Sequence, residues 1–138
     1  MRFTISFHAV GNRYNPSRVP FAFATQHDVG DLARLGRYKG QVYPYGSSEV
    51  KVPDDLPWGE KIPALVEVVR PLLPLMRAEG ADDFRVSAGY FHDSQCNLEF
   101  TPEELKLLAS LDCVFLLSCY PVDREPNHFP EPAPGAVH

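Results

Sequence analysis

The sequence predicts an α+β domain: a mixed, mainly antiparallel sheet of about five strands, with two main helices packed on one face and a ferredoxin-like core. Three observations lead to this fold class. Short segments alternate apolar and polar residues, which is typical of strands with one buried face. Two other segments repeat apolar residues every three or four positions, as amphipathic helices do. The segments follow the order strand, irregular segment, strand, helix, strand, strand, helix, strand.

The first half of the chain contains two predicted strands and a long irregular connection. Residues 2–9 alternate regularly, and the residues expected to face the core are Phe3, Ile5 and Phe7. Residues 13–46 are rich in proline and glycine, so we expect irregular structure with at most one or two helical turns. A connection of this length is often functional. The second strand is short, at 49–52.

Residues 62–79 predict the longer helix. Apolar residues recur at three and four positions, namely Ile62, Leu65, Val66, Val69, Leu72, Leu73 and Met76. Pro71 and Pro74 lie inside this pattern, and each removes a backbone donor, so we expect a kink or a break near Arg70. Gly80 is expected to end the helix in a left-handed conformation.

The stretch 96–120 predicts strand, capped helix and strand with little connecting chain. Residues 96–100 alternate and are expected to pair as a hairpin with a strand at 84–91. Thr101 and Glu104 have the spacing of a capping box, and the leucines that follow predict a largely buried helix. Residues 113–120 are apolar at nearly every position, which predicts a central strand buried on both faces and parallel to 96–100.

Length, charge and hydropathy limit the classes of function. The 138 residues suit one domain, at 1–121, followed by a proline-rich tail at 122–138. The net charge of −5 argues against a nucleic-acid-binding protein, which is usually basic. No apolar run is long enough to cross a membrane, and the alternating N-terminus does not resemble a signal peptide, so we expect a cytoplasmic protein.

The three cysteines are expected to be free and buried. An odd number does not complete a disulfide framework, and the spacings match no zinc signature. Cys96, Cys113 and Cys119 share parity with apolar neighbours, so all three are predicted to face the core. An alternative makes Cys96 a nucleophile with His92 as its base, in a small enzyme. Solvated turn chemistry explains His92 and Asp93 more simply.

Two surfaces are candidates for binding. Residues 34–46 interleave basic and tyrosine residues, a composition favoured at interface hot spots, although the tyrosines could equally pack over the core. The sheet face away from the helices is the second candidate. It is expected either to be covered by residues 13–46 or to bind a partner, and it would show Arg85, Ser87, Phe91, Asn97, Glu99, Leu116 and Tyr120.

With these segments in view, the chain resembles the bacterial domain-of-unknown-function 4279 family. The resemblance covers most of residues 2–121 and is strongest over 96–120, with looser matches at Arg37 to Gly40 and at Tyr45 to Ser47. Similar proteins are associated with polymorphic-toxin systems as candidate immunity proteins. The resemblance therefore implies a protein that binds and neutralises a cognate toxin, and it carries no catalytic residues.

Together these inferences predict a non-enzymatic binding protein without cofactors or metals that occludes the active site of a toxin. Acidic loops would meet a basic surface of the toxin, and aromatic residues would anchor the contact. The candidate partner-binding residues are Tyr43, Tyr45, Asp54, Asp55, Trp58, Glu60, Asp82, Asp83 and Asp93. The alternative is a small-ligand-binding sensor of ferredoxin-like type, and a homo-oligomer is possible in either case.

Overall fold

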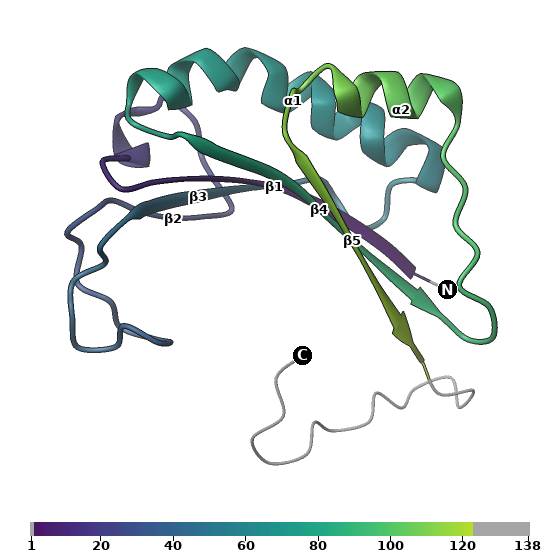
Figure 1. Ribbon diagram of the computed structural model, residues 1–138, viewed down its shortest axis with the longest axis horizontal. Coiled ribbons are helices and arrows are strands. Elements are labelled where there is room, and N and C mark those ends of the chain that lie inside the picture. Colours follow the sequence, from purple (N-terminus) through teal and green to yellow (C-terminus); the bar gives the residue numbers. More distant parts are fainter. Residues whose placement is uncertain (1, 123–138) are drawn as a thin grey trace.

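The computed structural model describes residues 2–122 and shows an α+β fold, with one five-stranded sheet and two main helices (Figure 1). The tail predicted at 122–138 lies, apart from Val122, outside the described residues. The elements in chain order are β1 (Arg2–Gly11), η1 (Pro16–Arg18), β2 (Thr25–His27), β3 (Gly46–Lys51), α1 (Trp58–Ala78), β4 (Asp83–His92), α2 (Pro102–Ala109) and β5 (Val114–Pro121).

The sheet has the order β2-β3-β1-β4-β5 and is mixed. β1 is antiparallel to both of its neighbours, β3 and β4, and β2 is antiparallel to β3. β3 and β4 therefore run parallel with β1 between them, and α1 connects them as a split β-α-β unit. β5 pairs with β4 in parallel at the edge of the sheet. This arrangement is consistent with the predicted ferredoxin-like core, although one predicted strand is absent.

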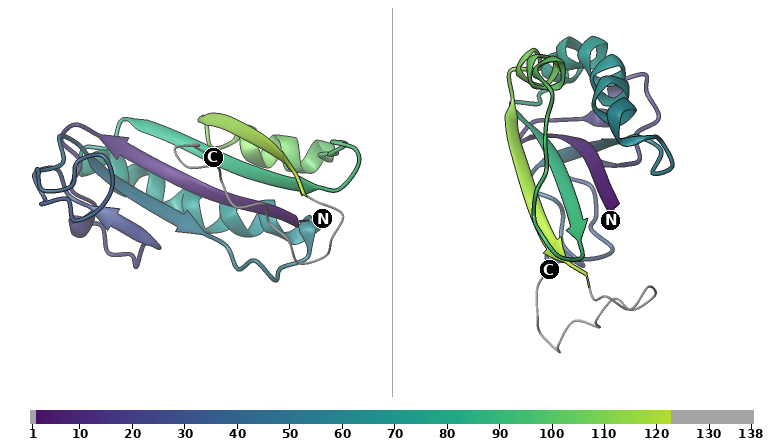
Figure 2. Two further views of the ribbon diagram at one scale, coloured as in Figure 1. Left: turned by 90° about the horizontal axis from the view of Figure 1, so that it is seen from below. Right: turned by 90° about the vertical axis from the view of Figure 1, so that its right-hand side faces the viewer.

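The core lies between the sheet and the helices, which cover one face (Figures 1 and 2). The alternation predicted for the first strand is confirmed, because Phe3, Ile5 and Phe7 are all buried. The inward positions of β4 are likewise buried: Phe84, Val86, Ala88 and Tyr90. None of the described helices lies on the opposite face of the sheet, and the view from below in Figure 2 shows its strands directly.

The predicted strand at 96–100 is wrong. Residues 93–101 have no regular secondary structure and connect β4 to α2, so the predicted hairpin is absent as well. Leu98 and Phe100 nevertheless pack against the core. Their alternation reflects an extended segment with one apolar side, which sequence periodicity does not distinguish from a strand.

The prediction of a central strand at 113–120 is also wrong. Within residues 2–122, β5 is the last strand of the sheet, and β4 is its one partner strand. Val114, Phe115 and Leu116 are consecutive exposed apolar residues. A continuous apolar run usually marks a strand covered on both faces, but here the outer edge and much of both faces of β5 stay open among the described residues.

The capping box predicted for the short helix is confirmed. The Thr101 hydroxyl accepts from the Glu104 backbone N–H at 3.1 Å, and the Glu104 carboxylate accepts from the Thr101 N–H at 3.0 Å. The predicted burial of this helix is only partly correct. Leu108 and Leu111 are buried, whereas Leu105 is 54% exposed, because α2 lies at the margin of the helical layer.

The expected break near Arg70 does not occur, because α1 is continuous from Trp58 to Ala78. Pro71 and Pro74 are exposed, so the carbonyl oxygens that lose a helical donor are on the solvent side. The apolar stripe continues past both prolines and holds the helix on the sheet. Gly80 follows with φ of 105°, which confirms the left-handed end of the helix.

Candidate protein-binding site

Residues 27–45, here called the hook, project from the end of the sheet formed by β2 and β3, on the side away from the helices (Figure 1). Tyr14 fixes the base of the hook to the core. Its ring is fully buried, and its hydroxyl lies 2.7 Å from Ser48 Oγ. Its carbonyl oxygen accepts from the Val29 N–H at 3.1 Å. The hook thus starts from a rigid part of the domain.

Backbone hydrogen bonds tie the two sides of the hook together. An isolated antiparallel bridge joins Leu32 to Val42, and the Tyr43 N–H donates to the Asp31 carbonyl oxygen at 2.9 Å. Ala33 N–H donates to Gln41, also across the hook, at 2.8 Å. The irregular structure predicted for residues 13–46 is confirmed only in part. The segment contains one helical turn, η1, but it also contains the strand β2, and the backbone of the hook is paired as in a short hairpin.

Four aromatic rings cluster on the hook. The imidazole of His27 stacks on Tyr43, with 3.5 Å between ring centroids and 10° between ring planes. Tyr45 contacts both rings edge-on, at 5.3 and 6.0 Å. Tyr38 completes the cluster, 6.0 Å from both Tyr43 and Tyr45. The four rings are partly buried against one another, and together they give the hook a small apolar core of its own.

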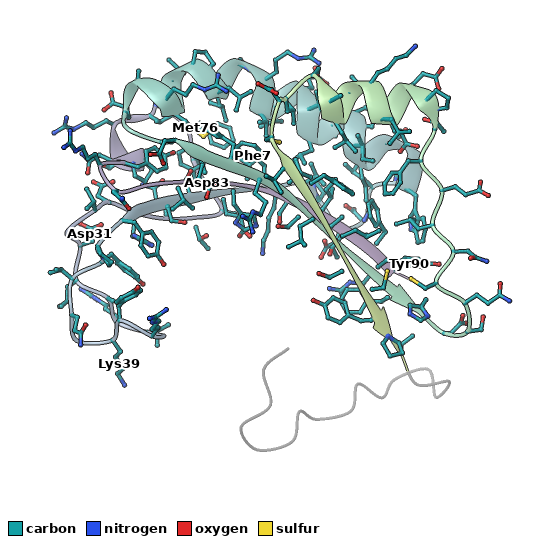
Figure 3. All side chains as sticks on the ribbon, in the orientation of Figure 1. Phe7, Asp31, Lys39, Met76, Asp83 and Tyr90 are labelled. Carbon is teal, nitrogen blue, oxygen red and sulfur yellow. The ribbon has the colours of Figure 1, made fainter. Side chains whose placement is uncertain are left out.

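The charges of the hook are divided between its base and its tip. Asp28 accepts from the backbone N–H and the hydroxyl of Ser17, and Asp31 accepts from the Asp28 N–H, so both carboxylates bond within the base. The tip, which comprises residues 32–42, carries only positive charges, from Arg34, Arg37 and Lys39. Figure 3 shows Lys39 at the far end.

The tip is also apolar, because Leu35 is 78% exposed and Leu32 and Val42 are 61% and 59% exposed. A basic and apolar projection of this kind has the composition of a protein-binding surface.

The nine candidate residues from the sequence do not form one surface. Tyr43 and Tyr45 lie in the hook at one end of the sheet, and Trp58 lies at the other. β1 spans the sheet with ten residues, which corresponds to roughly 30 Å. The acidic loops and the aromatic anchors predicted from the sequence are therefore divided between the two ends of the sheet, because they follow elements that end on different sides of the domain.

The end near Trp58 gathers five of the candidates around the start of α1 and the end of β4. Trp58 is 40% exposed, and its ring packs against Phe3 and Tyr90, each at 5.7 Å. The Trp58 side chain thus packs on core residues and also exposes part of its ring to solvent. The acidic candidates at this end are all exposed: Asp54, Asp55, Glu60 and Asp93.

The remaining candidates, Asp82 and Asp83, lie at the start of β4, at the same end of the sheet as the hook. Asp83 pairs with Val10 of β1. The next residue of β1, Gly11, pairs with Gly46, which directly follows the hook. The two aspartates line an open depression of about 370 Å³. Its other lining residues are Phe84, Asp112, Cys113 and Val114.

The open sheet face is not covered by residues 13–46 at β4 and β5, since the hook lies at the opposite edge (Figure 2). Phe91 stacks on Tyr120 at 5.0 Å, and the Arg2 guanidinium lies 5.0 Å above the Phe91 ring. Near the middle of this face, His8 Nε2 lies 3.3 Å from a Glu49 carboxylate oxygen. The predicted positions of Asn97 and Glu99 on this face are wrong, because both belong to the irregular connection.

The cysteines correct a further expectation. Cys96 and Cys119 are exposed, and Cys113 is partly buried, so the prediction that all three cysteines are buried is wrong. Contact with the Cys119 thiol, ahead of burial, raises the pKa of Cys96. A raised thiol pKa lowers the thiolate fraction at neutral pH and does not favour the alternative in which Cys96 is a catalytic nucleophile.

Sequence reasoning missed Tyr14 and His27 as the residues that hold the hook. Neither belongs to a segment long enough to show a period, because His27 ends the three-residue strand β2 and Tyr14 follows the turn after β1. One signal was present. Tyr43 and Tyr45 are two positions apart just before β3, and this spacing places two rings on one side of an extended chain.

No family model matches the chain, and no curated protein and no solved structure matches it either. Within residues 2–122, none of the helices combines the length and the hydropathy that a membrane-spanning segment requires.

Proposed function

We propose that this chain is a non-enzymatic protein-binding domain and that the hook is its primary contact. The observation that carries the proposal is the preorganised cluster of His27, Tyr38, Tyr43 and Tyr45 beneath an exposed basic tip. Rings locked by mutual stacking and by backbone hydrogen bonds lose little conformational entropy on binding. Ordered tyrosines with neighbouring arginines are typical anchors of protein interfaces.

The most specific form of the proposal is an immunity protein that neutralises a cognate bacterial toxin in the cytoplasm by covering its active site. The family resemblance implies this role. The geometry suggests a change in the expected electrostatics: the surface that meets the hook would be acidic or apolar, because the hook tip carries Arg34, Arg37 and Lys39. The acidic end of the sheet around Trp58 is the alternative contact surface, and it would bind basic groups of the toxin.

The proposal is tested by purifying the tagged chain from its native host and identifying the protein that co-purifies by mass spectrometry. Support requires a stoichiometric partner that arrests growth when expressed alone and is silenced by co-expression of this chain. Arg37→Glu with Lys39→Glu is expected to weaken the complex at least about 10-fold, equivalent to about 1.4 kcal/mol. Asp54→Asn with Asp55→Asn, at the other end of the sheet, is the matched control and is expected to bind normally.

A further inference from the structure

Two exposed thiols meet at the edge of the sheet. The Cys96 thiol lies close enough to the Cys119 thiol for this contact to raise the pKa of Cys96, although the two residues are far apart in the sequence. Cys119 pairs with Tyr90 across β4 and β5, and Figure 3 shows two neighbouring sulfur atoms close to Tyr90. Both thiols are open to solvent, so small reagents can reach them.

The packing of the irregular connection explains why these thiols meet. The ring of Phe100 contacts the ring of Phe115 at 5.6 Å. Cys96 lies four residues before Phe100, and Cys119 lies four residues after Phe115. An extended segment that runs antiparallel over β5 therefore places Cys96 over Cys119 when Phe100 lies over Phe115.

The residues halfway along the two segments agree with this alignment. Leu98 and Leu117 are both partly buried, and both pack against the core. The thiol contact is thus part of an ordered alignment that continues over several residues, rather than a chance encounter of two flexible side chains.

We propose that Cys96 and Cys119 form a reversible intramolecular disulfide, with a low-molecular-weight disulfide as the oxidant. One thiol loses its proton, and its sulfur attacks a sulfur of the reagent, which releases one reagent thiolate and leaves a mixed disulfide. The second cysteine thiolate then attacks the protein sulfur of that bond and releases the other half of the reagent as a thiolate. The two cysteines are oxidised by two electrons, and the reagent is reduced to two thiols.

The third cysteine is not part of this pair. Cys113 lies at the start of the β5 region, six residues before Cys119, and is partly buried. Burial raises the pKa of its thiol, which further limits its reaction. Replacing Cys113 with serine therefore removes the one thiol outside the pair and leaves Cys96 and Cys119 as the only thiols of the chain.

The disulfide would fix the connection between β4 and α2 across the edge strand. The cross-link would lower the conformational entropy of the unfolded chain. Its effect on the native fold should be small, because residues 93–101 have no regular secondary structure that a disulfide could distort. Because the disulfide closes the loop between Cys96 and Cys119, the midpoint of thermal unfolding is expected to rise by roughly 5–10 °C on oxidation. The oxidation is also expected to proceed faster at alkaline pH, because it requires a thiolate.

The experiment uses the full chain with Cys113→Ser, which leaves only the proposed pair. The reduced protein is incubated with oxidised glutathione, and thiols are counted after denaturation. Trypsin digestion without reductant then separates residues 86–106 from residues 107–124, which carry one cysteine each in this variant. Cys96→Ser and Cys119→Ser, each combined with Cys113→Ser, are the single-thiol controls, and circular dichroism checks their folding.

The expected result is loss of both thiols, a joined pair of tryptic peptides in a monomeric chain, and full recovery of the thiols with dithiothreitol. The single-thiol controls should stop at a mixed disulfide with glutathione. Two results would each overturn the proposal: both thiols of the pair remain free or end as separate glutathione adducts, or the joined peptides are found only in a covalent dimer.

Discussion

The imidazole of His27 lies face to face on the phenol ring of Tyr43, with 3.5 Å between centroids and 10° between planes. This stack closes the hook together with two backbone hydrogen bonds, which join Tyr43 to Gly30 and Asp31 on the opposite side of the hook. A side-chain contact thus holds in place a segment that has almost no regular secondary structure. The four stacked rings of the hook lie outside the main core, to which Tyr14 ties the base of the hook.

Replacing Tyr43 with alanine should loosen the hook and leave the domain folded. An aromatic pair of this kind contributes about 0.5–1.5 kcal/mol beyond its buried area, and the hook lies outside the main core. Amide hydrogen exchange should therefore speed up at Gly30 and Ala33, while amides of β1 keep their protection. Equal acceleration in the hook and in β1 would show that the hook is not a separate unit.

Stability should fall as the solution becomes acidic. Burial lowers the pKa of His27 below its usual value of 6.5, against the opposing effect of Asp28 and Asp31, and burial also lowers the pKa of His8 despite Glu49. Below pH 6.5 the unfolded chain gains protons that the folded chain does not bind. The stability present above pH 6.5 is therefore lost as the pH falls from that value through the folded-state pKa values. His27→Gln should reduce this slope in urea unfolding, and an unchanged slope would contradict the assignment.

Replacing Lys61 with methionine should destabilise the fold by about 1–3 kcal/mol. The Lys61 side chain is buried, and its Nζ donates to the carbonyl oxygens of Phe3 at 2.7 Å and Asp54 at 2.9 Å. Methionine fills similar space but leaves both acceptors without this donor. Urea unfolding measures the change, and Lys39→Met in the exposed hook tip is the control, with an expected effect within about 0.5 kcal/mol.

Replacing Gly46 with alanine should displace the junction between the hook and β3. A Cβ atom at this position would meet the Tyr14 carbonyl group, which leaves no room for a side chain. The main chain would have to move, so binding through the hook and stability should both decrease. Gly59→Ala is the matched control, because a Cβ there meets nothing and alanine favours the helix by up to about 1 kcal/mol. Equal stability of the two variants would refute the close approach.

The exposed edge strand β5 should promote self-association at high protein concentration. β5 carries no charged residue, and Val114, Phe115 and Leu116 are exposed beside a strand edge with which no other strand of residues 2–122 pairs. Leu116→Lys should therefore reduce association measured by sedimentation velocity. Leu105→Lys removes a similarly exposed leucine from α2, away from the edge, and should have little effect. A wild-type chain that stays monomeric at every concentration would contradict this prediction.

The sequence predicted the elements whose signals are local. The alternation of β1 and the capping box of Thr101 and Glu104 depend on neighbouring residues, and both were confirmed. The sequence failed where the partner of an element decides its environment. The apolar pattern of residues 113–120 is compatible with a central strand, and only the pairing of β5 with β4 shows that it lies at the edge.

The candidate site was predicted only in part, because its composition is a local signal whereas its contacts depend on the fold. The composition of residues 34–46 indicated a binding surface, but no periodicity could bring His27 beneath Tyr43, because their contact depends on the fold of the whole hook. The acidic residues were identified by type alone. Their division between two ends of the sheet follows from strand directions that the sequence does not specify.

The most direct test of the hook as the binding surface is a side-by-side purification from the native host. The wild-type chain, a Tyr43→Ala and Arg37→Glu double variant, and the Asp54→Asn and Asp55→Asn control are captured in equal amounts, and the co-purifying protein is quantified by mass spectrometry. The account predicts one stoichiometric partner with the wild type and the control, and its loss with the hook variant. Retention of that partner by the folded hook variant, with loss from the aspartate control, would contradict the account and place the contact at the Trp58 end.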